Sequence, residues 1–414
     1  MVSGYKHTID GILVIAVAGR PFSGLERLFL PTGPFFVRDC SDHKMSFHKE
    51  SCYNSTSVSR RTAIFIFKFQ AMSVSLLCAC AAAMLIGIPQ QAIAADASAP
   101  GATQVAPWKD NKKAAFLLMF DDNAPSHLKN AIPELKKRNF TGTFYVCPGK
   151  GWSDAWKKEV PGMGMEYGNH TNTHSGAKDA EKLDEEIKLC AEAIDKAYPD
   201  RKTPRLISWG QPGTGKGTWL VTNEQVREAC MKYNLIDRGP FMGAAIHYKN
   251  GKDMVAVVDK AISSGSAGYI VFHGVGGDWL SASMPDFLQL LDYLVSKQDQ
   301  IWVTDHISSH KYATERAGAE VKVVEATDKK IQLALTSKIS PRIIELDGKS
   351  YTNDKADPKL YDAPLTLITK VPASWQKCQI TQGAQKTTAT AANGTLQYEA
   401  LPNSDPISIQ PATL

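Results

Sequence analysis

The chain has 414 residues, of which 43% are hydrophobic and 21% are charged, and its formal net charge is +5. This composition excludes a disordered chain, and eight cysteines are too few for a disulfide-dense miniprotein. The small basic excess does not indicate nucleic-acid binding. The length suffices for two or three domains, each with its own core.

A secretory signal is predicted near residues 60–95. The 20 residues from Phe69 to Ile88 carry no charge, basic residues precede them, and Ala92 and Ala94 have the spacing of a signal-peptidase site. We therefore expect cleavage near Ala94 or Ala95 and export to the periplasm or the extracellular space. An uncleaved membrane anchor is the alternative, because such a run approaches the length that spans a bilayer.

Residues 1–95 are interpreted as a leader. Signal peptides stand at the N-terminus of a protein, so we expect translation to begin at Met45 or Met72. Nine of the basic residues and five of the acidic residues lie in this leader, which leaves the rest of the chain almost neutral. Residues 96–107, rich in Ala, Ser and Pro, are expected to form a linker.

Predicted strands and helices alternate between residues 108 and 316. The predicted strands are 114–120, 143–146, 206–209, 269–272 and 301–304. The predicted helices are 127–138, 179–198, 223–233, 254–263, 285–296 and 307–316. Such alternation is typical of a parallel α/β sheet or barrel. Cys190 and Cys230 fall on two of these helices, where they either pair or are buried as small apolar side chains.

The pattern changes after residue 318. The predicted strands of this part are 321–325, 331–336, 342–346, 365–371 and 396–401, with Gly, Asn and Pro between them. Residues 318–414 are therefore expected to form a small sandwich-like β-domain. This part holds no cluster of catalytic side chains, so we expect it to be an accessory domain.

Side chains suited to chemistry stand where strands of the α/β part end. Asp121 and Asp122 follow the first strand, His170 and His174 lie near the end of another candidate strand, and His273 follows a later one. The carboxyl ends of parallel strands gather at one edge of the fold, so these groups should meet there. Two carboxylates and three imidazoles are typical of a metal hydrolase. The two histidines four positions apart can face one ion if their segment is helical or tightly turned.

These motifs, in this order and spacing, resemble the polysaccharide deacetylase family, which is carbohydrate esterase family 4 with its NodB-type domain. The motifs are F-D-D-N at 120–123, T-F-Y-V at 143–146, G-N-H-T-N-T-H at 168–174 and I-V-F-H at 270–273. The resemblance covers residues 108–316 and implies a distorted (β/α) barrel, here followed by the small all-β domain.

The resemblance also implies an activity and a cofactor. Family members are hydrolases that remove N-acetyl or O-acetyl groups from polysaccharides such as peptidoglycan, chitin-type glycan or xylan. They use one divalent metal, which we expect to be Zn²⁺, with Co²⁺, Ni²⁺ or Mn²⁺ as alternatives.

The family's roles carry over to matching positions of this chain. Asp122, His170 and His174 would hold the metal. Asp121 would be the general base that takes a proton from water, and His273 would be the general acid that protonates the leaving amine or alcohol.

The third family motif departs from the expected pattern. The family has an arginine two residues before a proline, and here Gly210 stands in its place while Pro212 is kept. That arginine orients the catalytic aspartate in the family, and Gln211, Arg205 and Arg238 are candidates to replace it. A catalytically weak or inactive carbohydrate-binding relative is therefore the alternative function.

Five further residues are candidates for the site. Gln211, Pro212 and Gly213 are placed at the substrate or the oxyanion by the resemblance. Trp279, after a glycine-rich loop, either stacks on a sugar or anchors that loop. Asp237 either orients the acid or is an ordinary turn residue.

Residues 210–216 also match the phosphate-binding pattern G-x-x-x-x-G-K. The hydroxyl residue that should follow the lysine is Gly217, and Pro212 removes one amide donor from the loop. We therefore expect an acetylated polysaccharide or oligosaccharide as the partner, and neither nucleotide nor nucleic acid. The sequence carries no signal for an oligomeric state.

Overall fold

The structure is a computed structural model that describes residues 4–9, 12–17, 29–30, 33–34, 98–346 and 349–412. The predicted signal near residues 60–95 therefore lies outside the described residues. The chain forms two units, Met1–Ile88 and Pro89–Leu414. In the first unit, β1 (Gly4–Ile9) pairs with β2 (Ile12–Val17), and β3 (Phe29–Leu30) pairs with β4 (Gly33–Pro34). In the part of the chain that the structure describes, no helix has the length and apolarity to cross a membrane.

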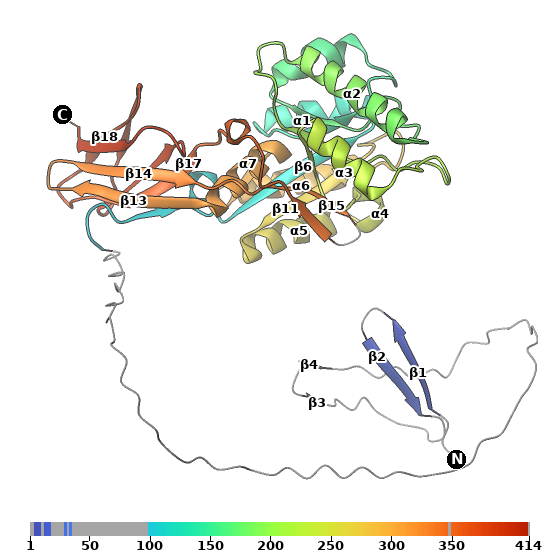
Figure 1. Cartoon of the computed structure of the whole chain (residues 1–414), viewed down its shortest axis with the longest axis horizontal. Coiled ribbons are helices and arrows are strands. Elements are labelled where there is room, and N and C mark those ends of the chain that lie inside the picture. The colour runs from blue at the N-terminus through green and yellow to red at the C-terminus, as the bar shows by residue number, and fades with distance from the viewer. Residues whose placement is uncertain are drawn as a thin grey trace, which may run out of the picture. The chain divides into compact units, whose positions relative to one another are not determined.

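A parallel sheet forms the centre of the second unit (Figure 1). Its strand order is β10-β9-β8-β7-β6-β11, and β12 pairs with β6 as well. The strands are β6 (Ala114–Asp121), β7 (Thr143–Val146), β8 (Glu166–Asn169), β9 (Ile207–Trp209), β10 (Leu235–Asp237), β11 (Ala267–Phe272) and β12 (Ile301–Thr304). This sheet and its helices confirm the predicted distorted (β/α) barrel.

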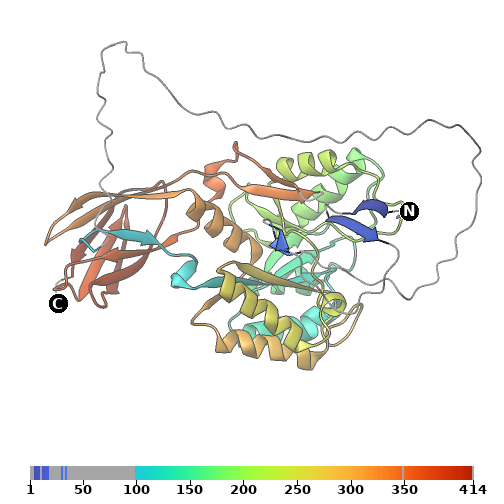
Figure 2. The ribbon, with the colours of Figure 1, turned by 90° about the horizontal axis from the view of Figure 1, so that it is seen from below.

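Helices connect these strands and pack around the sheet (Figure 2). They are α1 (Ile132–Lys137), α2 (Ala180–Ala197), α3 (Asn223–Lys232), α4 (Ala244–His247), α5 (Gly251–Ser264), α6 (Met284–Ser296) and α7 (His306–Ala317). The expected helix over 127–138 begins with a π-helical turn, η2 (His127–Ala131), beside Pro133, which has no amide hydrogen to donate. Short helical turns are η1 (Lys109–Asn111), η3 (Ala155–Glu159), η4 (Pro161–Met163) and η5 (Pro358–Leu360).

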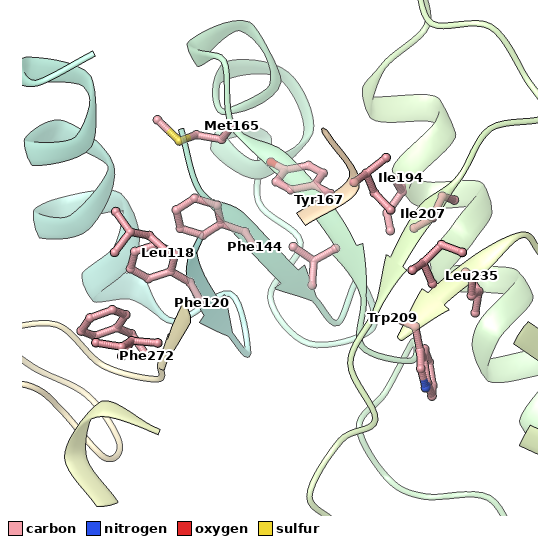
Figure 3. Packing of buried hydrophobic residues seen from close by; sticks show 14 of the residues in the cluster. Leu118, Phe120, Phe144, Met165, Tyr167, Ile194, Ile207, Trp209, Leu235 and Phe272 are labelled. Atoms are coloured by element: carbon pink, nitrogen blue, oxygen red, sulfur yellow. The ribbon is translucent and has the colours of Figure 1, made fainter. Parts of the chain in front are cut away.

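The strands send alternate side chains to two environments. In β6, Leu118 and Phe120 pack with helices in the large core of the barrel (Figure 3), whereas Leu117 and Met119 belong to a small cluster on the opposite face. Asp121 continues the row of Leu117 and Met119. The alternation therefore places its carboxylate at the strand end, on the face away from the large core.

The C-terminal part consists mostly of strands, as predicted. One antiparallel sheet has the order β13-β14-β21-β18-β19 and a second has the order β20-β17-β5. The strands are β5 (Thr103–Val105), β13 (Ala319–Ala326), β14 (Ile331–Ser337), β17 (Leu365–Lys370), β18 (Lys377–Gln382), β19 (Gln385–Thr390), β20 (Thr395–Ala400) and β21 (Ile407–Pro411). Residues 103–105, expected in a linker, instead pair as β5 with β17 and so satisfy the backbone groups of its free edge.

One hairpin of the C-terminal part packs on the barrel. β15 (Arg342–Leu346) and β16 (Lys349–Thr352) pair with each other, and β15 lies against β10 and α3 (Figure 1). Ile343, Ile344 and Tyr361 are buried in the same core as the barrel strands. The sheets after residue 318 have a core of their own, which includes Ile331 and Ile409, but this hairpin crosses the expected boundary and belongs to the core of the barrel.

The cysteines of the described residues are buried and free. Cys190 donates a hydrogen bond from its thiol to the carbonyl oxygen of Val146, at 3.2 Å. Cys190 and Cys230 therefore occupy core positions as small side chains, which is one of the two alternatives that their helices allowed.

Candidate metal and catalytic site

The five predicted metal-binding and catalytic side chains meet at the carboxyl ends of three barrel strands. Asp121 ends β6 and Asp122 follows it, His170 follows β8, and His273 follows β11. His174 reaches the same place by a tight turn rather than a helix. Its backbone is left-handed, with φ of 57°, and its amide donates to the hydroxyl of Thr171 at 3.0 Å.

Three of these residues form a site that fits a metal ion. Nε2 of His170 lies 3.5 Å from Oδ1 of Asp122, and Nε2 of His174 lies 3.3 Å from the same oxygen. Their ligand atoms all lie within 4.8 Å of one another. Among the described residues, this buried oxygen of Asp122 has no hydrogen-bond partner. A buried carboxylate oxygen without a donor, facing two imidazole nitrogens, is the donor set that a divalent cation satisfies.

Supporting contacts orient His170 and hold the turn that carries His174. Nδ1 of His170 donates to the carbonyl oxygen of Gly210 at 2.6 Å, which leaves Nε2 free to act as the ligand atom. Glu186, from α2, accepts hydrogen bonds from the amide of Thr173 at 2.7 Å and from its hydroxyl at 2.8 Å. Glu186 is not among the residues that the sequence motifs point to. Its signal was a carboxylate on the apolar face of the predicted helix 179–198.

Arg238 holds the predicted base Asp121 in a buried ion pair. The two guanidinium nitrogens Nη1 and Nη2 donate to the two carboxylate oxygens, with Nη2 and Oδ2 2.8 Å apart. Burial alone would raise the pKa of Asp121, but Arg238 and the neighbouring imidazoles outweigh it and keep this pKa below its ordinary value. The carboxylate is therefore ionised and oriented by a two-point contact.

Of the three candidates to replace the missing arginine, the structure selects Arg238. Gln211 is exposed, and Arg205 is engaged elsewhere, with its Nε 3.0 Å from Asp195 and its Nη1 3.3 Å from Glu166. Arg238 directly follows β10, and Gly210 directly follows the neighbouring strand β9.

His273 faces both carboxylates of the site. Its Nε2 lies 4.0 Å from Oδ2 of Asp121 and 3.8 Å from Oδ2 of Asp122. The side chain of His127 forms a hydrogen bond with the backbone carbonyl of His273. Burial lowers the pKa of His127 to about 4, so this imidazole is neutral and donates through Nε2. His127, which belongs to none of the sequence motifs, thus supports the strand end that carries the predicted acid.

The glycine-rich loop after β11 is tied down beside the site. Asp278 accepts a hydrogen bond from the amide of Ser126 at 2.6 Å, and the hydroxyl of Ser126 accepts one from the amide of Val275 at 3.1 Å. Trp279 is 71% exposed at the end of this loop. The loop is therefore anchored by groups other than the Trp279 ring, and that ring is free to meet a ligand.

The remaining candidate residues differ in exposure. Pro212 is buried, whereas Gln211 and Gly213 are exposed on the loop after β9. Asp237 ends β10, where its Oδ2 accepts from the amide of Gly239 at 3.1 Å and lies 3.9 Å from Nη1 of Arg342.

Part of this chain is similar to known proteins. Residues 109–226 match the family model described as polysaccharide deacetylase. One curated relative, a gellan lyase from a Bacillus species, is 23% identical over 356 residues. That alignment covers 75% of this chain but 13% of the relative, so the chain spans a small part of the relative's length.

Several solved structures show lower similarity. A family 4 carbohydrate esterase from Streptomyces lividans in complex with acetate is 19% identical, with a TM-score of 0.32, over 47% of this chain and 94% of its own. The peptidoglycan deacetylase PdaC from Bacillus subtilis is 20% identical, with a TM-score of 0.34, over 49% of this chain and 90% of its own. A family 4 pseudoenzyme from Bacillus anthracis is 16% identical, with a TM-score of 0.36, over 48% of this chain and 66% of its own.

Proposed function

We propose that this protein is an exported, metal-dependent hydrolase that removes acetyl groups from a polysaccharide. The match of residues 109–226 to the polysaccharide deacetylase family model supports this proposal. The observation that carries the proposal is the meeting of Asp121, Asp122, His170, His174 and His273 at one edge of the barrel. Peptidoglycan, chitin-type glycan and acetylated xylan are the candidate substrates, with either N-acetyl or O-acetyl groups.

The proposed metal ligands are Asp122, His170 and His174. A divalent ion such as Zn²⁺ polarises an acetyl carbonyl and lowers the pKa of water when it is bound at such a set of ligands. These three residues supply one carboxylate and two imidazoles, which leaves coordination positions open for water and substrate.

Two residues of the chain move protons in the proposed reaction. The Asp121 carboxylate, paired with Arg238, takes one proton from the attacking water, whose oxygen bonds to the acetyl carbon. His273, on the other side of the carboxylates, gives a proton to the leaving nitrogen or oxygen as its bond to the acetyl carbon breaks. The products are acetate and a free amine or hydroxyl on the glycan.

Acetate release tests this function. We expect zinc-loaded protein to release acetate from at least one of acetylated chitooligosaccharide, peptidoglycan and acetylxylan, and a chelator to abolish the release. Asp121→Asn should lower kcat by about 10²–10⁴-fold, since general acid–base catalysis has this size. The exposed Asp154→Asn serves as the matched control.

Two outcomes would contradict the proposal. Glycan binding without acetate release from any of the three substrates would establish the alternative, an inactive carbohydrate-binding relative. An unchanged kcat in Asp121→Asn would show that Asp121 is not the general base.

The proposal of export has its own measurement. The apolar run and the Ala92 and Ala94 pattern lead us to expect that the mature protein begins near Asp96. Intact mass or N-terminal sequencing of the protein from its natural source checks this, and a mature chain that retains residues 1–44 would contradict it.

A further inference from the structure

Arg238 lies between the Asp121 carboxylate and the face of the Tyr145 ring. The guanidinium carbon of Arg238 is 4.4 Å from the centroid of that ring, while its nitrogens meet both oxygens of Asp121. All three side chains are buried. The ring therefore forms the surface against which the arginine rests.

Two glycines make room for this arrangement. In the sheet register, Tyr145 of β7 stands opposite Asp121 of β6 on one side and Gly168 of β8 on the other. A Cβ at Gly168 would lie 2.5 Å from Cδ1 of Tyr145. A Cβ at Gly210 would lie 2.9 Å from the same ring atom and 3.0 Å from the guanidinium carbon of Arg238. Gly210 is thus small because Arg238 occupies the space in front of it.

A hydrogen-bonded chain holds the far end of the ring. The hydroxyl of Tyr145 is 2.7 Å from Oγ of Ser208, and that Oγ is 2.7 Å from Nδ1 of His306. Burial lowers the pKa of His306 well below its ordinary value and raises the pKa of Tyr145, so the chain is neutral. The Tyr145 ring is therefore held in one orientation. Gly168 and Gly210 lie against its edge, and Ser208 forms a hydrogen bond with its hydroxyl.

The arrangement exceeds what core packing needs. A phenyl ring would fill the same slot without requiring a hydrogen-bond chain through two further buried polar residues. A buried carboxylate–guanidinium pair also gains from its charges only when the two groups meet in good geometry, because both are desolvated. A fixed surface behind the guanidinium supplies that geometry.

We propose that Tyr145, anchored by Ser208 and His306, is the positioning residue that aims Arg238 at the catalytic carboxylate. The inference rests on the proposed function, in which Asp121 is the base. It assigns Tyr145 no contact with the substrate, so its effect on catalysis runs through Arg238.

A double-mutant cycle in kcat tests this dependence. We expect Tyr145→Leu to lower kcat by about 10–100-fold, the size of a small misplacement of catalytic groups. Arg238→Met should lower kcat at least as much, and adding Tyr145→Leu to it should lower kcat no further. Substrate KM should change by less than about twofold in Tyr145→Leu, because no substrate contact is lost. The Tyr145 ring also packs against the ring of His170, with centroids 6.2 Å apart, so kcat of each variant is compared at saturating zinc.

Two phenylalanine variants complete the cycle. Tyr145→Phe is nearly isosteric, so it should fold normally and lower kcat by a smaller factor, since it keeps the ring and loses only the hydroxyl anchor. Tyr167→Phe is the matched control, because Tyr167 is another buried tyrosine whose hydroxyl donates to the carbonyl of Trp156. The proposal would be overturned if kcat of the double variant fell by the product of the two single-variant decreases. It would also be overturned if Tyr145→Leu and Tyr145→Phe both kept the wild-type kcat.

Arginine side-chain NMR gives a readout that does not depend on activity. Two-point pairing hinders rotation of the guanidinium, so we expect separate Nη signals of Arg238 in the wild-type protein and in Tyr145→Phe, identified by their loss in Arg238→Met. These signals should merge in Tyr145→Leu. Unchanged signals in Tyr145→Leu would overturn the proposal. If the wild-type protein releases no acetate, the proposed function fails and this spectrum still decides the role of Tyr145.

Discussion

Two adjacent carboxylates serve one site because the backbone turns between them. Neighbouring residues of a strand point to opposite faces, so Asp121 and Asp122 would diverge if β6 continued. Asp122 instead adopts a left-handed backbone, with φ of 72°. This conformation is unfavourable for residues with a side chain, and such strain gathers at functional sites. It lets Asp122 face the two imidazoles while Asp121 pairs with Arg238.

His174 offers the residue-scale prediction for the metal site. His174→Ala should lower zinc affinity by more than about 100-fold, beyond the effect usual for residues that only support a ligand. The replacement removes one of three ligands, and competition with a chromogenic chelator measures it. His247→Ala, which removes an exposed histidine outside the cluster, is the control. Equal zinc occupancy in the His174 variant would refute the assigned ligands.

Helix α2 is the element that holds the histidine turn in place. Its first turn is capped by Asp179, whose carboxylate accepts from the amide of Lys182 at 2.8 Å. Glu186 lies on the buried face of the same helix and receives both donors of Thr173. The helix thus presents a buried acceptor to the turn that carries His170 and His174.

Removing this acceptor should weaken the metal site. Glu186→Ala leaves the Thr173 amide and hydroxyl without a partner, so we expect zinc affinity to fall by about 10–100-fold, as for other supporting residues of metal sites. The neighbouring Glu185→Ala, which removes an exposed carboxylate on the same helix, should leave zinc affinity unchanged. Equal affinities in the two variants would show that the turn holds its shape without α2.

At the scale of the whole molecule, the barrel and the C-terminal strands are joined through buried contacts. The hairpin β15–β16 places Ile343 and Ile344 in the core of the barrel. On α7, Glu315 accepts a hydrogen bond from the amide of Ala363 at 3.0 Å, and its carbonyl accepts one from the hydroxyl of Ser337. The two parts should therefore unfold together rather than as separate domains.

Glu315 makes this joint stability depend on pH. Burial, with a smaller contribution from Asp362, raises the pKa of Glu315 to about 7, although the Ala363 amide partly offsets it. The folded protein therefore binds more protons than the unfolded chain between pH about 4.5 and 7, and the free energy of unfolding falls as pH rises through this window. The loss should be on the order of 1–3 kcal/mol.

Urea unfolding at pH 5 and pH 8 checks this dependence. Glu315→Gln cannot ionise, so its stability relative to the wild type should increase between the two pH values. The exposed Glu320→Gln is the control and should show no such change. A constant difference between Glu315→Gln and the wild type at both pH values would contradict the assignment.

The sequence by itself determined most regular elements of the barrel and which side chains make up its candidate metal site. The strands over 143–146 and 301–304 match the structure, and α2 and α3 lie within a residue of their predicted ends. Hydrophobic periodicity and capping residues are local signals, so a single stretch of chain carries them. The strand β10 (Leu235–Asp237) was not predicted.

Only the tertiary structure decided which groups support the site and how the two parts meet. Arg238 pairs with a carboxylate 117 positions away, and the sequence could offer it only as one of three candidates. The alternation in residues 342–346 predicts a strand but not the surface on which that strand packs. Pairing between distant residues depends on strand order and register, which bring Tyr145, Gly210 and Arg238 together, and no local pattern contains that information.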